Sequence, residues 1–329
     1  MSSTLVTRQF WIHSPGRGEI VTAELLPPGE DDVLVRTIYS GISRGTESLV
    51  FRGEVPISQY GPMRAPFQEG EFPGPVKYGY SSVGEVLQAP ERLSALIGRP
   101  VYCLYPHQDL YAVPAIAVTP VPETVPPGRA ILAANLETAV TAVWDSAPSV
   151  GDRIVVIGAG VVGLLVAWLC RQFAGVQVRV VDPDPSRDAP ARELGLDLLA
   201  QPPAEGNADL VVHASGTVEG LAAALAAAGE EAAVLELSWY GSRSVALPLG
   251  ENFHSRRLTL RSSQVGRIPP ERAPRWTRER RLALVLRLLR EPRLDALISG
   301  ESTFDNLPER MAELAQDGRG VLCHRIRYS

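Results

Sequence analysis

The chain has 329 residues and a formal net charge of −5 at pH 7, with 45% hydrophobic and 21% charged residues. This length fits two domains of ordinary size, and this composition is typical of a packed globular protein rather than a disordered or fibrous one. The modest negative charge argues against nucleic acid as a partner, because binding to phosphates needs a basic surface. The sequence has no secretory leader pattern at its start and no 18-residue apolar run, so we expect a cytoplasmic protein with no membrane partner.

The first part of the chain has a β pattern. Residues 4–40 alternate short β-favouring runs with Pro/Gly turns, which predicts a small β-rich barrel. Residues 52–77 follow, rich in Gly, Pro, Gln and Arg and without a clear period. Because long irregular segments inside a compact domain are often functional, this one is a candidate substrate loop, with a variable surface insertion as the alternative. Short apolar runs at 101–104 and 111–118 continue the β pattern.

The composition changes after residue 130. Ala-rich helical stretches now alternate with pure Val/Ile/Leu runs such as IVVIGAG and DLVVHASG. Strands of a parallel sheet look like this because helices cover both of its faces, so we predict a doubly wound α/β domain over about 140–265. Residues 279–289 have leucines at helical spacing and predict an amphipathic helix. We interpret its arginines as a solvated face, and collection of an acidic substrate or lipid is the alternative.

A glycine-rich turn follows the first strand of this domain. Gly158 permits the tight turn, Gly160 lets the backbone approach a pyrophosphate, and Gly163 lets the next helix pack close to the strand. The N–H groups and the dipole at that helix start attract phosphates. The predicted phosphate-binding residues are Gly158, Gly160, Val161, Val162 and Gly163.

An acidic residue ends the second strand. Asp182 comes 19 residues after Gly163, where a carboxylate meets the adenosine ribose hydroxyls. Its charge would repel a 2′-phosphate, so the sequence predicts NAD rather than NADP as the cofactor. Arg187 is a nearby cation that could offset this repulsion.

With a β-rich domain before the nucleotide domain, the sequence resembles the medium-chain alcohol dehydrogenase superfamily over essentially its full length. The resemblance implies a GroES-like barrel over residues 1–138, completed by 266–329, and a Rossmann NAD-binding domain over 139–265. It also implies a homodimer formed through the nucleotide domain. The segments that carry it are SGISRGTE (40–47), GYSSVGEV (79–86), the GAGVVG turn, HASG (213–216) and residues 297–328.

Two short motifs narrow the resemblance. SGIS-x-GTE and Gly-Tyr-x-Ser-x-Gly are most similar to the bacteriochlorophyllide 3-hydroxyethyl dehydrogenase branch, which oxidises a secondary alcohol to a ketone. The positions that hold catalytic zinc in the superfamily are Ser43, Tyr80, Ser81 and Glu137 here, and one carboxylate with hydroxyl groups does not hold zinc. The structural zinc lobe is missing as well, because only three cysteines occur in the whole chain. We therefore expect no metal.

The resemblance also suggests individual roles. Arg44 stands where family members place a phosphate-contacting arginine, and Thr46 approximates the proton-relay hydroxyl. Arg187 matches a family cation near the adenosine ribose, with Ser215 at the strand end beside it. Ser43 and Thr46 are candidate catalytic hydroxyls that could instead only satisfy backbone groups of a turn.

Without zinc, a side chain must accept the proton of the alcohol. Glu137 is the preferred base, because its pKa needs to rise only about two units from roughly 4.3, whereas a Tyr base would cost about 4 kcal/mol at pH 7. Tyr80 would then donate a hydrogen bond to the substrate oxygen. The alternative is a buried Glu137 capping a helix start near Thr138 and a Tyr80 that fills the barrel wall. His107 and Glu47 are the next candidates for the base.

Together these features predict a zinc-independent, NAD-dependent oxidoreductase that interconverts a secondary alcohol, as in a polyol or a hydroxyalkyl substituent, and a ketone. Its partner would be a small-molecule substrate. Two alternatives stay open. One is a zinc-free quinone or enone reductase of the same superfamily, which usually takes NADPH, and the other is an NAD-binding protein without chemistry.

Overall fold

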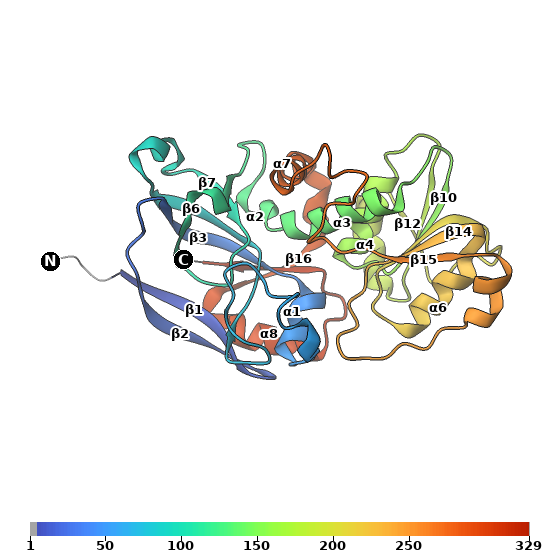
Figure 1. The fold of residues 1–329 in the computed structure, drawn as a ribbon, viewed down its shortest axis with the longest axis horizontal. Coiled ribbons are helices and arrows are strands. Elements are labelled where there is room, and N and C mark those ends of the chain that lie inside the picture. The colour runs from blue at the N-terminus through green and yellow to red at the C-terminus, as the bar shows by residue number, and fades with distance from the viewer. Residues whose placement is uncertain (1–4, 329) are drawn as a thin grey trace. The chain divides into compact units, whose positions relative to one another are not determined.

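The computed structural model of the chain describes residues 5–328, so the first four residues and the last one of the predicted ranges lie outside the described part. The chain divides into two compact units, drawn in Figure 1: unit 1 has residues up to 134 and from 286 onward, and unit 2 has residues 135–285. The sequence-based boundaries after residues 138 and 265 differ from these by 4 and 20 residues. The second break between the units falls within α7 (Arg278–Leu288).

Unit 1 consists mainly of β-structure. One sheet has the order β16-β17-β3-β6-β7-β9 with β8 beside β3, and a second has the order β2-β1-β5-β4. The last strand pairs antiparallel with β3, so the end of the chain returns to the first part, as expected. The strands are β1 (Leu5–Ser14), β2 (Arg17–Leu25), β3 (Asp32–Ile42), β4 (Glu69–Gly70), β5 (Val76–Lys77), β6 (Ser82–Gln88), β7 (Pro100–Cys103), β8 (Leu110–Pro114), β9 (Val118–Pro120), β16 (Ile298–Thr303) and β17 (Cys323–Arg327).

Alternating side chains of the larger sheet form a core in unit 1. Val33, Val35, Val86 and Val101 are fully buried there and pack with Tyr111. The helices of this unit include α1 (Arg44–Phe51), α2 (Pro127–Ala130) and α8 (Leu307–Gln316). The segment 52–77 has only one 3-10 turn and the two short strands β4 and β5, so it is largely irregular, as its sequence predicts.

Unit 2 is built on one parallel sheet of six strands in the order β12-β11-β10-β13-β14-β15. This is the doubly wound order in which the chain direction across the sheet reverses between β10 and β13. Helix α4 packs on β10 and β11, and α6 packs on β10, β13 and β14 (Figure 1). The elements are α3 (Ala133–Ser146), β10 (Arg153–Ile157), α4 (Val161–Cys170), β11 (Gln177–Val181), α5 (Asp188–Glu193), β12 (Asp197–Leu199), β13 (Ala208–His213), α6 (Val218–Ala227), β14 (Ala228–Glu236) and β15 (Thr259–Ser262).

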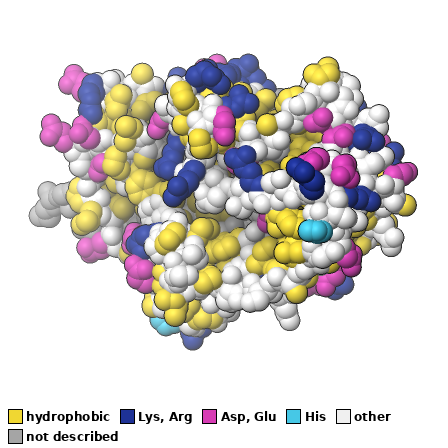
Figure 2. All heavy atoms as spheres, turned by 45° about the vertical axis from the view of Figure 1, so that its right-hand side comes forward, with side chains coloured by type: hydrophobic (Ala, Val, Ile, Leu, Met, Phe, Trp, Pro, Cys, Tyr) yellow, Lys and Arg dark blue, Asp and Glu magenta, His cyan; other side chains and the backbone are white. Residues whose placement is uncertain are grey.

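The pure apolar runs of the sequence are the central strands of this sheet. Val156, Val211, Val212 and Val234 are fully buried, which is why these strands carry no alternating polar residues. The predicted α/β class and the parallel sheet are confirmed. Within residues 5–328, no helix is both long and apolar enough to cross a membrane. Lys and Arg side chains lie among Asp and Glu side chains on the face drawn in Figure 2.

Candidate active site

Three of the predicted catalytic residues meet in unit 1. Ser43 precedes α1, Thr46 lies in its first turn, and Tyr80 lies just before β6. The Tyr80 hydroxyl hydrogen-bonds with the side chains of both Ser43 and Thr46. Burial and the charge of Glu47 raise the pKa of Tyr80 far above its ordinary value, against the lowering effect of the two hydrogen bonds. Tyr80 is therefore a neutral phenol at neutral pH, suited to donating a hydrogen bond and not to acting as a base.

A buried acid–imidazole pair lies beside this hydroxyl cluster. The Glu47 and His107 side chains are 2% and 1% exposed, and His107 Nε2 lies 2.8 Å from Glu47 Oε2. Because a carboxylate only accepts hydrogen bonds, Nε2 is the donor. The other Glu47 oxygen accepts the Ser43 N–H (2.8 Å), and Ser40 Oγ lies 2.7 Å from His107 Nδ1. Glu47 and His107, the next candidates for the base after Glu137, therefore belong to one hydrogen-bonded network next to Tyr80.

Ser81, at the third position of the superfamily's zinc pattern, makes a hydrogen bond to the backbone. Ser81 Oγ donates a 2.5 Å hydrogen bond to the Ile131 carbonyl. Burial raises the pKa of the Cys323 thiol, which lies near Glu47, to about 12, so this cysteine is a protonated core residue. Cys103 and Cys170 are also buried and free. In the part of the chain that the structure describes, no three His, Cys, Asp or Glu side chains form a group that could hold a metal ion.

Glu137 belongs to unit 2 and makes a buried ion pair there. Its side chain is 7% exposed, and its Oε1 accepts a 3.0 Å hydrogen bond from Arg281 Nε. Arg281 also donates to Thr141 Oγ1 (2.9 Å) and to the Val265 carbonyl (2.8 Å). Burial raises the pKa of Glu137 against the opposing charge of Arg281, which is the direction that a base requires. Its role as the base stays a prediction.

The alternative role of Glu137 at a helix start is wrong. Helix α3 begins at Ala133, so residue 137 lies one turn inside the helix and not at its first residue. Its carboxylate points to Arg281, a residue 144 positions further along the chain.

The glycine-rich turn of unit 2 has the geometry of a phosphate-binding loop. Gly158 has a φ of +105°, and a Cβ there would lie 2.6 Å from the Ser215 nitrogen. A Cβ on Gly163 would lie 1.9 Å from the Gly158 carbonyl oxygen, so only glycine allows α4 to approach β10 this closely. A Cβ on Gly160 would meet nothing within 4 Å, and no side chain caps the start of α4 at this residue. This open helix start fits a pyrophosphate group.

Asp182 lies beside the same turn. One carboxylate oxygen accepts the Ala159 N–H (2.8 Å) and the other accepts the Asp184 N–H (2.9 Å). Arg187 is buried, and its Nε lies 3.4 Å from Asp184 Oδ2. Since Asp184 already faces this cation, Arg187 is less available to offset the charge of Asp182. Arg44, in unit 1, donates to the Gly318 carbonyl (2.9 Å), and its role as a phosphate contact stays a prediction.

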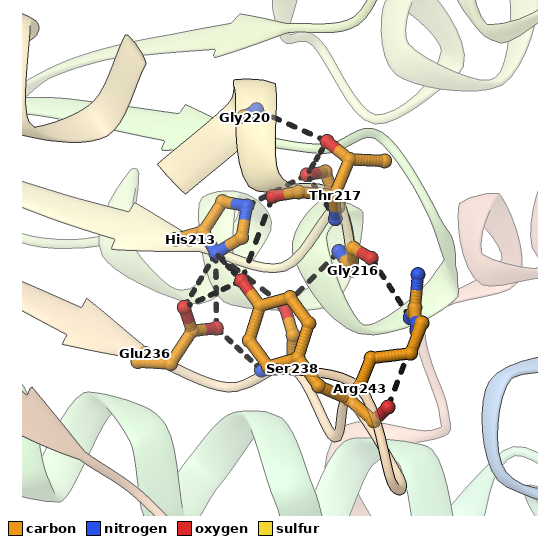
Figure 3. A network of polar contacts seen from close by, with 9 residues as sticks. His213, Gly216, Thr217, Gly220, Glu236, Ser238 and Arg243 are labelled. Carbon is orange, nitrogen blue, oxygen red and sulfur yellow. Dashed lines mark hydrogen bonds and ion pairs between the residues drawn. The ribbon is translucent and has the colours of Figure 1, made fainter. Parts of the chain in front are cut away.

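Ser215 follows β13, on the other side of β10 from β11 and therefore from Asp182. Its hydroxyl lies 2.6 Å from Nε2 of His213, which in turn contacts Glu236 (Figure 3). The sequence analysis missed both His213 and Glu236. The available signal was a pair of ionisable residues, each ending a hydrophobic strand.

No protein-family model matches the chain. Over 306 residues it is 23% identical to D-guloside 3-dehydrogenase of Escherichia coli (strain K12), a match that covers 85% of this chain and 87% of that protein. A shorter match, 30% identical over 121 residues, joins 33% of this chain to 35% of an uncharacterized zinc-type alcohol dehydrogenase-like protein of Haemophilus influenzae. L-idonate 5-dehydrogenase from Escherichia coli superposes with a TM-score of 0.79 at 15% identity, covering 98% of this chain and 99% of that one.

The chain therefore has the fold of the medium-chain dehydrogenases, a GroES-like barrel with a Rossmann domain, and the predicted fold class is confirmed. Its relatives and structural neighbours are alcohol dehydrogenase-like oxidoreductases, which supports an oxidoreductase. Of the structural neighbours, one was solved with NADH and another with NADP. The bacteriochlorophyllide branch, the preference for NAD, zinc independence and the homodimer stay predictions.

Proposed function

We propose that the chain is a zinc-independent, NAD-dependent dehydrogenase that oxidises a secondary alcohol of a sugar or polyol to a ketone. The observation that carries this proposal is the hydroxyl cluster of Tyr80, Ser43 and Thr46, in which Tyr80 and Ser43 stand where the superfamily pattern has metal ligands. Neutral hydroxyl groups are poor zinc ligands, but they bind and orient an alcohol oxygen well. The match to a dehydrogenase named for a glycoside supports a sugar-like substrate.

The unit 2 turn would hold the cofactor. The open start of α4 after Gly160 suits the pyrophosphate, and the Asp182 carboxylate suits the adenosine ribose hydroxyls and disfavours a 2′-phosphate. When bound, the nicotinamide ring supplies the hydride acceptor. The chain itself must orient the substrate hydroxyl and accept its proton.

Tyr80 is the proposed oxygen-orienting group. As a neutral phenol it donates a hydrogen bond to the substrate oxygen, while Ser43 and Thr46 fix the direction of its hydroxyl. The sequence favours Glu137 as the proton acceptor, but because Arg281 holds that carboxylate in a buried ion pair, we propose the buried Glu47–His107 pair for this role. The Glu47–His107 pair has the advantage of lying in the same unit as Tyr80.

The test is a screen of glycosides, polyols and other secondary alcohols with purified protein and NAD⁺, following NADH absorbance. We expect turnover that is unchanged by a chelator and lowered by Tyr80→Phe. Enones with NADPH serve as the comparison, because a reductase of the same fold would turn these over instead. Activity with enones alone, or activity that a chelator abolishes and zinc restores, would refute the proposal.

A further inference from the structure

Two neighbouring strands of unit 2 end in an acid–imidazole pair. His213 and Glu236 are directly opposite each other in the register of β13 and β14. His213 is fully buried, the Glu236 side chain is 13% exposed, and His213 Nδ1 lies 2.7 Å from Glu236 Oε2. Figure 3 shows both in a polar network at the carboxyl ends of their strands.

A series of hydrogen bonds in this network leads from Gly220 to Glu236. The Gly220 N–H donates to Thr217 Oγ1 (3.0 Å), which leaves the Thr217 hydroxyl hydrogen for Ser215 Oγ (2.9 Å). The Ser215 hydroxyl then donates to His213 Nε2 (2.6 Å), and His213 Nδ1 donates to the carboxylate. Since a carboxylate can only accept, His213 Nδ1 is the donor to Glu236.

Glu236 is the anion at the end of this series of hydrogen bonds. Burial alone would raise its pKa, but the His213 contact and the Ser238 N–H (2.6 Å) outweigh burial and lower the pKa. Tyr240 donates its hydroxyl to Glu236 (3.1 Å), and its own pKa is raised by burial and by that charge, so it stays neutral. Arg243 is the nearby cation, but it is exposed and donates to the carbonyls of Gly216 (3.3 Å) and Tyr240 (3.2 Å). Among the described residues it forms no ion pair with Glu236.

The position of Glu236 in the sheet indicates which half of a bound dinucleotide it would face. Asp182 marks the adenosine side, at the end of β11. The rest of the dinucleotide must cross the point where the strand order reverses, and Ser215 packs there against Gly158 of the glycine-rich turn. The nicotinamide half of a bound dinucleotide would therefore face the ends of β13 and β14. Neighbouring strands are about 4.8 Å apart, so the end of β14 is roughly 10 Å from the turn after β10.

We propose that the Glu236–His213 pair is an electrostatic selector that makes the site bind NAD⁺ in preference to NADH, an inference that rests on the proposed NAD dependence. The nicotinamide ring carries a positive charge only in the oxidised form. Two opposite unit charges about 10 Å apart, at an effective dielectric constant of about 20, change a binding constant about tenfold. The pair thereby favours binding of the oxidised cofactor over the reduced one.

Glu236→Gln tests the selector by removing the charge while keeping a carbonyl that accepts from His213. Dissociation constants for NAD⁺, NADH and ADP-ribose are measured by calorimetry, and thermal unfolding checks the fold. We expect NAD⁺ to bind about tenfold more weakly, with NADH and ADP-ribose changed less than twofold. Asp209→Asn is the matched control, because Asp209 lies at the opposite end of β13 and pairs with Arg153. It should leave all three constants unchanged.

The outcomes separate the selector from the proposed function. Wild-type protein that binds all three ligands, with NAD⁺ affinity unchanged in Glu236→Gln, would overturn the selector alone. Equal losses for all three ligands in a folded variant would also overturn it, because the contact would then be structural. Wild-type protein that binds none of them would overturn the proposed function and the selector with it. If Glu236→Gln is unstable, Glu236→Met provides the same comparison.

Discussion

Glu137→Gln separates a catalytic from a structural role of this carboxylate. Glu137 and Arg281 are 7% and 4% exposed, so removing one charge leaves the other buried without its counter-ion. Breaking a buried pair in this way costs about 3–5 kcal/mol. The Gln amide oxygen can still accept a hydrogen bond from Arg281 Nε, and Arg281 keeps its hydrogen bonds to Thr141 and Val265. The expected loss of unfolding free energy is therefore near the lower limit of this range. For a domain of this size, a loss of about 3 kcal/mol lowers Tm by on the order of 10 °C.

The assay combines thermal unfolding with turnover measured well below the variant's Tm. We expect folded Glu137→Gln to retain most of its kcat, and the double variant Glu137→Gln/Arg281→Met to recover most of the lost stability, because a buried pair replaced as a unit costs little. Glu47→Gln is the comparison for catalysis. A folded Glu137→Gln protein with near-normal Tm and a kcat lowered by about 10²–10⁴ would refute this reasoning and support Glu137 as the base.

Four further outcomes are expected. Tyr80→Phe should lower kcat by about 10²–10⁴ with little change in the dissociation constant of NAD⁺. If kcat and the affinity for NAD⁺ fall by the same factor, the role of Tyr80 at the substrate oxygen is contradicted. NAD(H) should bind at least about tenfold more tightly than NADP(H), and Asp182→Ala should narrow this gap in calorimetry; equal constants in the wild type would refute it. Elemental analysis of protein purified without chelator should find no stoichiometric zinc, and one zinc per chain whose removal abolishes activity would contradict that. Burial, with a smaller effect of the Arg310 charge, lowers the pKa of His324 from 6.5 to about 4, so the stability it contributes is complete above pH 6.5 and is lost as the pH falls toward 4. Over this range Tm should fall more steeply for the wild type than for His324→Gln, and parallel curves would exclude this effect.

The features that the sequence predicted well are local ones. The GAGVVG turn and Asp182 are separated by one strand and one helix, and the structure joins them by a hydrogen bond from Ala159 to Asp182. The buried strands were recognisable because burial on both faces of a sheet requires continuous apolar runs. Fold class and the tight geometry of the glycine-rich turn therefore followed from residues close together in the chain.

The polar pairs were not predictable in this way. His107 lies 60 residues from Glu47, and Arg281 lies 144 residues from Glu137. Each pair depends on which segments the fold brings together, and neither residue type carries a periodic signal. The His213–Glu236 pair depends on the register of two parallel strands, which the sequence of either strand does not specify.

A site without zinc must obtain positive charge elsewhere. Zinc makes an alcohol acidic by stabilising the alkoxide with its own charge, whereas Tyr80, Ser43 and Thr46 offer neutral hydrogen bonds. The buried Glu47 opposes alkoxide formation further, as its effect on the Tyr80 pKa indicates. Under the proposed function, the positive nicotinamide ring of NAD⁺ would supply such a charge together with the hydride acceptor. An anion that favours binding of NAD⁺, as we propose for Glu236, would then raise the fraction of protein that holds the oxidised form which the oxidation consumes.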